Sequence, residues 1–218
     1  MRRITPLDTK SIQFLTKFIV ESDAIEGIQA DSEPINAQLE LGMQYGHVGA
    51  LLLLEQQSQE KKETVTKDLI CQVQGFITDE QHTKPGGSWL KPEYIGHYRK
   101  VAVSIGGRLA PDPGHVSRLM LGWIDKVTAW QRDCHSRTQI QNLREIARYH
   151  FYYEYIHPFA DGNGRSGRAL VYYMMRYCGI QPFLFTSTDR YETYYRCFEN
   201  QEAMCKYFEA KSQASFAD

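Results

Sequence analysis

Residues 157–168 have the sequence His-Pro-Phe-Ala-Asp-Gly-Asn-Gly-Arg-Ser-Gly-Arg and join two segments whose apolar residues recur at helical spacing. The first predicted helix covers residues 139–155, with its apolar side chains on one face. Pro158 disfavours the α conformation in the residue before it. We therefore expect His157 to leave the helix in an extended conformation, with its imidazole in a cleft. The second predicted helix covers residues 164–178 and is apolar nearly all round, which is typical of a buried central helix.

The start of the second helix has the features of an anion site. Gly162 and Gly164 allow the backbone to approach a ligand closely. The first N–H groups of a helix have no partner within it, and the helix dipole attracts phosphate. Arg165 and Arg168 lie in the first turn, where positive charge opposes the dipole by some tenths of a kcal/mol. Their presence indicates that an anion or a carboxylate belongs there.

Asp161 and His157 complete a candidate reaction centre beside this anion site. Magnesium commonly takes one or two carboxylates together with substrate phosphates, so Asp161 is a candidate metal ligand. The imidazole of His157 is a candidate base for the proton of an incoming hydroxyl. The spacing predicts a site for a magnesium nucleotide.

The pattern H-x-F-x-D-G-N-G-R-x-x-R, from His157 to Arg168, matches the signature of the Fic domain family at every defined position, so the chain resembles that family. The resemblance implies a mainly α fold, a helical bundle with a short β-hairpin flap. It also implies the site roles, namely His157 as the base for the target hydroxyl, Asp161 as the magnesium ligand, Gly162, Asn163 and Gly164 as the cradle of the α and β phosphates, Arg165 and Arg168 as ligands of the outer phosphates, and Phe159 as the anchor of the loop.

A β-hairpin is predicted upstream, because Val101, Val103 and Ile105 alternate with other residues before Gly106-Gly107. This segment is similar to the family's flap, a hairpin that aligns the target peptide by strand addition. The resemblance thus implies a target-docking flap that comprises Val101, Val103, Ile105 and Leu109. A purely structural hairpin is the alternative.

The segment Ser22-Asp-Ala-Ile-Glu26-Gly27 is similar to the family's inhibitory motif. Glu26 precedes a glycine that would cap a helix, and a carboxylate at a helix C-terminus is disfavoured by about 0.3–1 kcal/mol unless a cation is near. The resemblance implies that Arg168 is this cation, and that the pair blocks the γ-phosphate of ATP. An ordinary amphipathic helix that ends at Gly27 is the alternative.

The resemblance therefore implies a protein adenylyltransferase. It would transfer AMP from ATP to a Ser, Thr or Tyr hydroxyl of a target protein, with Mg²⁺, under autoinhibition by Glu26. Two alternatives stay open: an enzyme that removes AMP from a modified protein, and a catalytically silent nucleotide-binding interaction module. Self-modification and homodimer formation also stay open.

The composition indicates which classes of partner the protein binds and in which compartment it lies. The formal net charge is −1, so no general basic excess points to nucleic acid or to a membrane surface, and we expect neither as a partner. The five cysteines form no C-x-x-C pair, which favours reduced thiols and a cytoplasmic location.

The chain is long enough for one compact domain. Within it we expect an N-terminal helical region at residues 1–93, which carries the inhibitory helix, and a Fic core at residues 94–218. The strongly polar residues 55–68 are expected to form a solvated helix end or a loop.

Overall fold

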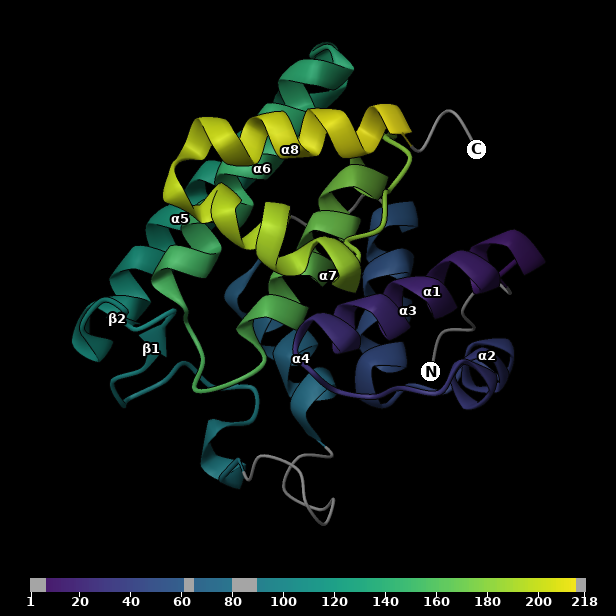
Figure 1. Ribbon diagram of the computed structural model, residues 1–218, viewed down its shortest axis with the longest axis horizontal. Coiled ribbons are helices and arrows are strands. Elements are labelled where there is room, and N and C mark those ends of the chain that lie inside the picture. The colour runs from purple at the N-terminus through teal and green to yellow at the C-terminus, as the bar shows by residue number, and fades with distance from the viewer. Residues whose placement is uncertain (1–6, 61–64, 80–89, 215–218) are drawn as a thin grey trace.

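The structure is a computed structural model that describes residues 7–60, 65–79 and 90–214. Within these ranges the chain is mainly helical, as the sequence predicts (Figure 1). The α-helices are α1 (Thr9–Ile25), α2 (Ser32–Glu40), α3 (Gly46–Glu60), α4 (Lys67–Thr78), α5 (Pro113–Asp133), α6 (Gln139–Ile156), α7 (Asn163–Tyr177) and α8 (Gln201–Ala214). Shorter helical turns are η2 (Pro92–Tyr94), η3 (Cys134–Ser136), η4 (Ser187–Asp189), η5 (Arg190–Tyr194) and η6 (Tyr195–Glu199).

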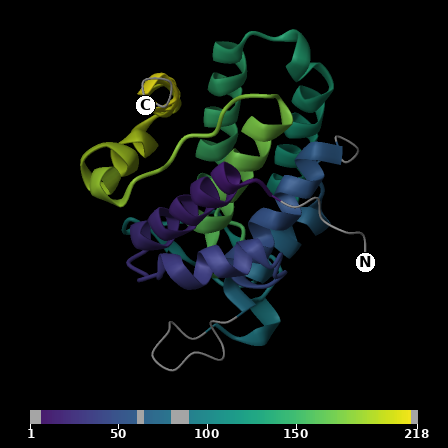
Figure 2. The ribbon, with the colours of Figure 1, turned by 90° about the vertical axis from the view of Figure 1, so that its right-hand side faces the viewer.

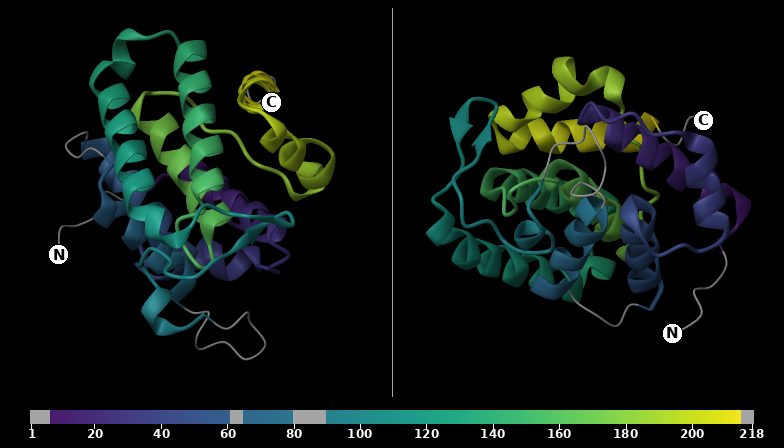
Figure 3. Two further views of the ribbon diagram at one scale, coloured as in Figure 1. Left: turned by 90° about the vertical axis from the view of Figure 1, so that its left-hand side faces the viewer. Right: turned by 90° about the horizontal axis from the view of Figure 1, so that it is seen from below.

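Helix α7 lies at the centre of the bundle (Figures 1 and 2). It packs against α1, α3, α4 and α6, and residues 169–175 are buried on every side. Helix α8 covers the far side of α6, and α5 and α6 lie side by side (Figure 3). The central position predicted for the second motif helix is therefore confirmed.

One hydrophobic cluster takes side chains from both predicted regions, for example Leu15 and Leu51 from the first and Tyr173 and Phe208 from the second. The division of the chain between residues 93 and 94 stays a prediction. No helix in the described parts of the chain combines the length and the apolar character that crossing a bilayer requires.

The β-hairpin is present but shorter than predicted. Strand β1 (Ser104–Ile105) pairs antiparallel with β2 (Arg108–Leu109), and Gly106 and Gly107 form the turn with φ angles of 53° and 82°. Val101 and Val103 precede β1, so the strand predicted to contain them is wrong in its length. Outside the two strands the ladder continues only through the N–H of Ala110, which donates to the carbonyl of Val103 at 3.0 Å. A two-stranded ribbon has few partners to extend its pairing.

The polar stretch at residues 55–68 differs from the prediction at its start. Glu55 lies in α3 and is 3% exposed. Its carboxylate accepts hydrogen bonds from Tyr172 and from the guanidinium of Arg176, at 2.5 Å and 2.6 Å. The residue is buried because it has these partners on α7, which local composition does not reveal.

Candidate active site

The loop between α6 and α7 is fixed by one asparagine. The side chain of Asn163 accepts a hydrogen bond from the N–H of Phe159 at 2.8 Å and donates to the carbonyl of the same residue at 2.9 Å. The Phe159 ring is fully buried, in agreement with its predicted anchoring role. Because the Asn163 amide is already paired, a phosphate would meet the backbone of this residue rather than its side chain.

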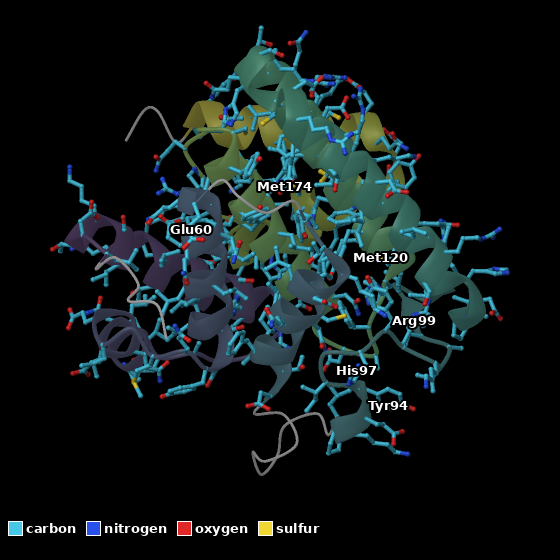
Figure 4. The ribbon with its side chains drawn as sticks, turned by 180° about the vertical axis from the view of Figure 1, so that it is seen from behind. Glu60, Tyr94, His97, Arg99, Met120 and Met174 are labelled. Atoms are coloured by element: carbon cyan, nitrogen blue, oxygen red, sulfur yellow. The ribbon has the colours of Figure 1, made fainter. Side chains whose placement is uncertain are left out.

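His157 ends α6 in the left-handed conformation, with φ 50° and ψ 65°, so the extended conformation predicted for it is wrong. Pro158 does exclude continuation of the helix, but the chain reverses at His157, whose N–H still donates to the carbonyl of Tyr153 at 2.9 Å. Arg99, which is labelled in Figure 4, stabilises this reversal, because its Nε donates to the His157 carbonyl at 2.7 Å. The ring is thereby held at the junction of the two motif helices.

The imidazole of His157 is partly exposed, and its Nδ1 lies 3.2 Å from the backbone carbonyl of Glu154. A carbonyl can only accept, so Nδ1 carries the proton and Nε2 keeps a lone pair. Burial lowers the pKa of His157, and the nearby charge of Arg99 lowers it further, against the opposing effect of the Glu154 carbonyl. The neutral imidazole, which is the form that acts as a base, is favoured.

Arg168 and the predicted inhibitory motif meet at the start of α7. Arg168 is 1% exposed. Its Nε donates to Ser22 Oγ at 3.0 Å, and its Nη2 donates to the Ser22 carbonyl at 2.8 Å and to Glu26 Oε1 at 2.7 Å. Glu26 is the C-cap of α1, and Gly27 follows with φ 75°, as the sequence predicts.

The Glu26 carboxylate also covers the N-terminus of α7. A Cβ placed on Gly164 would overlap Glu26 Oε1 and lie 3.0 Å from Arg168 Nη1. The absence of a side chain at Gly164 therefore lets the carboxylate lie against the helix start. It occupies the position where the helix dipole and the guanidinium would otherwise attract an anion.

Arg165 points elsewhere. It is buried, and its Nη1 lies 3.5 Å from the carbonyl of Ile77 on α4. Its Nε has no hydrogen-bond partner among the described residues. A buried guanidinium nitrogen without a partner is costly, so Arg165 has donor capacity for an anionic ligand at this end of α7.

Asp161 lies at the entrance of the loop, half-buried, with Oδ1 accepting from the N–H of Gly162 at 2.7 Å. Among the described residues no group of three or more His, Cys, Asp or Glu side chains is placed to hold a metal ion. A single carboxylate beside a helix start is nevertheless compatible with magnesium, which commonly completes its shell with substrate phosphates and water.

The flap residues lie apart from this centre, on the hairpin. Leu109 is 80% exposed and Val101 is 39% exposed, whereas Val103 and Ile105 are half-buried. The hairpin and the loop are connected by Arg99, whose Nη1 donates to the Val101 carbonyl at 2.9 Å.

Sequence reasoning missed three residues that hold the site. These are Arg99, Gln74 on α4, and Arg190 on η5. The Gln74 side chain donates to the carbonyl of Asp161 at 3.1 Å and accepts from the N–H of Gly96 at 2.6 Å. Arg190 donates to the carbonyls of Ala24 and Ile25, both at 2.9 Å, and so caps the helix that carries Glu26. Their partners are distant in sequence, so no local pattern indicates them.

Comparison with known proteins gives one family. Residues 64–175 match the model of the Fic/DOC family. The protein adenylyltransferase Fic of Culex quinquefasciatus is 28% identical over 184 residues, which cover 82% of this chain and 32% of that protein. Its namesake in Drosophila melanogaster is 27% identical over 181 residues, which cover 83% of this chain and 32% of that protein. The chain thus spans about a third of the length of these curated relatives.

Solved structures show the same fold. A Fic domain containing signaling protein from Bacteroides thetaiotaomicron superposes with a TM-score of 0.73 at 19% identity, over 98% of this chain and 91% of that one. Residues 134–508 of Fic-1 from C. elegans superpose with a TM-score of 0.66 at 18% identity, over 96% of this chain and 64% of that one. The family match covers more than half of the chain and contains His157, Asp161 and Arg168. The chain therefore belongs to the Fic/DOC family.

Proposed function

We propose that this protein is an adenylyltransferase that moves AMP from ATP to a hydroxyl of a protein. The observation that carries the proposal is the junction of α6 and α7. A neutral imidazole at His157 lies beside a helix N-terminus with two buried guanidinium groups, Arg165 and Arg168. A base next to a polyphosphate site is what transfer of a nucleotidyl group to a hydroxyl requires. The curated relatives carry the name of this activity.

The reaction starts with the target hydroxyl at His157. Nε2 accepts the proton of the hydroxyl, while Nδ1 stays bonded to the Glu154 carbonyl. The hydroxyl oxygen then attacks the α-phosphorus of ATP in line, and pyrophosphate leaves. The N–H groups at the start of α7 stabilise the charge that grows on the departing oxygens. Arg165 and Arg168 bind the outer phosphates in this proposal.

The nucleotide is expected to bind as its magnesium complex. Asp161 is the residue that would hold the ion, through an oxygen of the kind magnesium prefers. The ion, when bound, supplies charge neutralisation for the phosphates. Gln74 holds the Asp161 carbonyl, so this chain fixes the backbone of the candidate ligand before any ion arrives.

Glu26 is proposed to restrain the enzyme. Its carboxylate takes one of the donors of Arg168 and lies against Gly164, where a phosphate would have to lie. Like charges disfavour each other, so ATP with its outer phosphate in place and Glu26 in its observed position are mutually exclusive. Activity would require Glu26 to move.

The target peptide is proposed to dock on the hairpin. The exposed edge near Val101 and Leu109 offers backbone groups for strand addition, and Arg99 connects it rigidly to His157. We also propose a cytoplasmic location, because none of the five cysteines forms a disulfide in the structure.

Incubation with ATP and Mg²⁺, followed by intact-mass analysis and by transfer of α-phosphate label to proteins of a cell lysate, tests the proposal. Wild type, Glu26→Ala and Glu26→Ala/His157→Ala are compared. We expect an AMP-sized increment or label with Glu26→Ala and none with the double variant. Glu33→Ala, an exposed glutamate on the neighbouring α2, is the matched control and should behave as wild type.

Absence of AMP transfer in every form would contradict the proposal. If wild type instead removed AMP from a modified protein and Glu26→Ala did not, the reverse activity would replace it. If the variants bound ATP and neither added nor removed AMP, the chain would be a nucleotide-binding interaction module.

A further inference from the structure

Glu154 is a buried carboxyl group beside the candidate base. It lies on α6 one turn before His157 and is 7% exposed. Its Oε2 is 3.7 Å from His157 Nδ1, and its backbone carbonyl is 3.2 Å from the same nitrogen. Its Oε1 is buried and has no hydrogen-bond partner among the described residues. A buried carboxyl with an unpartnered oxygen is costly and requires an explanation.

Gly167 provides the space for this carboxyl. A Cβ placed on Gly167 would overlap Glu154 Oε1 and would lie 3.1 Å from the Tyr153 ring. Position 167 is not defined in the family signature, and here it carries the one residue that avoids the overlap. The two helices therefore accommodate the Glu154 carboxyl at the price of a glycine inside α7.

Charged and titratable groups surround the pair on several elements. Arg168 from α7 and Glu26 from the end of α1 act on Glu154 with opposite signs. The groups that act on His157 are Arg99, Glu26 and Asp161. Two buried phenols, Tyr153 on α6 and Tyr194 on η5, also interact with Glu154. Among the described residues, the cationic group within ion-pair distance of Glu154 Oε2 is a protonated His157, whose Nδ1 lies 3.7 Å away.

We propose that Glu154 is a positioning residue for His157, which orients the ring through Nδ1 and offsets the charge that appears when Nε2 accepts a proton. The inference rests on the proposed function and deepens it. The O–H bond of the target breaks, its proton goes to Nε2, and the oxygen electron pair forms the new bond to the α-phosphorus. The bond to pyrophosphate breaks at the same time. The imidazolium then faces a carboxylate across its Nδ1–H, in the way that an acid orients the histidine of a hydrolase triad.

The expected protonation states of Glu154 and His157 agree with this positioning role. Burial raises the pKa of Glu154 to about 8; Arg168 opposes the rise, and Glu26 adds to it. Two groups this close titrate as a pair, so the first proton that arrives as the pH falls is shared between them. The form that accepts a proton best has Glu154 ionised and His157 neutral, because the product pair is then uncharged overall.

Histidine NMR measures this without any enzymatic activity. The His157 ring signals, assigned by their loss in His157→Ala, are followed against pH in wild type, Glu154→Gln and Glu145→Gln. In wild type we expect two steps, one near pH 8 and one below the ordinary histidine value. Glu154→Gln should keep only the lower step. Glu145→Gln, the same substitution on the outer part of α6, should match wild type. One step in wild type, or two in Glu154→Gln, would overturn the proposal.

The pH dependence of AMP transfer supplies the second readout, in the background of Glu26→Ala. With Glu154 present, kcat should rise through about pH 8. Adding Glu154→Gln should move this rise to lower pH and reduce the maximal kcat by at least about tenfold, with KM for ATP unchanged. An unaltered profile would overturn the proposal. Absence of AMP transfer at every pH would instead count against the proposed function, and the NMR titration would still decide the role of Glu154.

Discussion

Arg99 donates hydrogen bonds to the carbonyls of two consecutive residues, His157 and Pro158. Its Nε donates to the His157 carbonyl at 2.7 Å, and its own N–H donates to the Pro158 carbonyl at 2.9 Å. Its Nη2 reaches the carbonyl of Pro111 beyond the hairpin at 2.6 Å. One buried cation thus connects the base, the motif loop and the flap.

Arg99→Met should destabilise the fold by at least about 2 kcal/mol, because several buried carbonyls lose their donor at once. Urea unfolding followed by circular dichroism measures the loss. Arg137→Met is the matched control: Arg137 pairs with Asp133 on the surface and should change stability by less than about 0.5 kcal/mol. Equal effects of the two substitutions would contradict the connecting role of Arg99.

Gly162→Ala should destabilise the protein by about 1–3 kcal/mol, because Gly162 has a φ of 77° and a Cβ there would lie 2.6 Å from Thr78 Cγ2. Thr78→Ser removes that methyl group and keeps the hydroxyl, which bonds the Gln74 carbonyl. The double variant should recover part of the loss, with a coupling above about 0.5 kcal/mol in a denaturant cycle. If the free-energy changes of the two single variants simply added, the strain would lie in the backbone of residue 162 and not in its contact with Thr78.

Glu26→Ala should bind a non-hydrolysable ATP analogue with Mg²⁺ more tightly than wild type by at least about tenfold, which corresponds to about 1.4 kcal/mol. The reason is that the carboxylate no longer covers Gly164 or competes for Arg168. Isothermal titration calorimetry measures the change. The exposed Glu33→Ala should bind as wild type does, and an unchanged affinity in Glu26→Ala would contradict the competition.

Glu55 should make the stability depend on acid pH. Burial alone would raise its pKa, but the hydrogen bonds from Arg176 and Tyr172 hold the pKa below its ordinary value of 4.5. A carboxyl with a lowered folded pKa contributes stability that is fully present above the unfolded pKa. This stability is lost as the pH falls from 4.5 through the folded value. Between pH 7 and pH 3, Glu55→Gln should therefore lose less stability than wild type in urea unfolding. Equal losses would contradict the lowered pKa.

The sequence predicts the motif helices, the hairpin turn and the partnership of Glu26 with Arg168. The helices and the turn follow from local patterns, namely apolar spacing, Pro158 and Gly106-Gly107. The pairing followed from the family resemblance, and the structure places the two groups 2.7 Å apart. The catalytic and metal roles of the motif residues stay predictions.

The remaining features depend on contacts between distant segments. Glu55 is separated by 121 residues from Arg176, so its polar neighbours in sequence indicated a solvated position that is wrong. The left-handed backbone of His157 depends on a donor from Arg99, 58 residues away. Glu154 is a buried residue of α6, and its unpartnered oxygen follows from packing against Gly167, which the sequence does not indicate.

The hydrogen bonds between Ser22 and Arg168 affect how quickly Glu26 can leave the start of α7. Arg168 donates to both the hydroxyl and the carbonyl of Ser22, and to one carboxylate oxygen of Glu26. A rotation about the side-chain bonds of Glu26 would thus uncover the N-terminus of α7, while Ser22 keeps the Arg168 guanidinium in its position. Such torsions take place within nanoseconds at exposed positions, and Glu26 is 33% exposed in its side chain. Helix α1 would not have to unfold or depart, so an incoming nucleotide would meet a receptor that is already assembled.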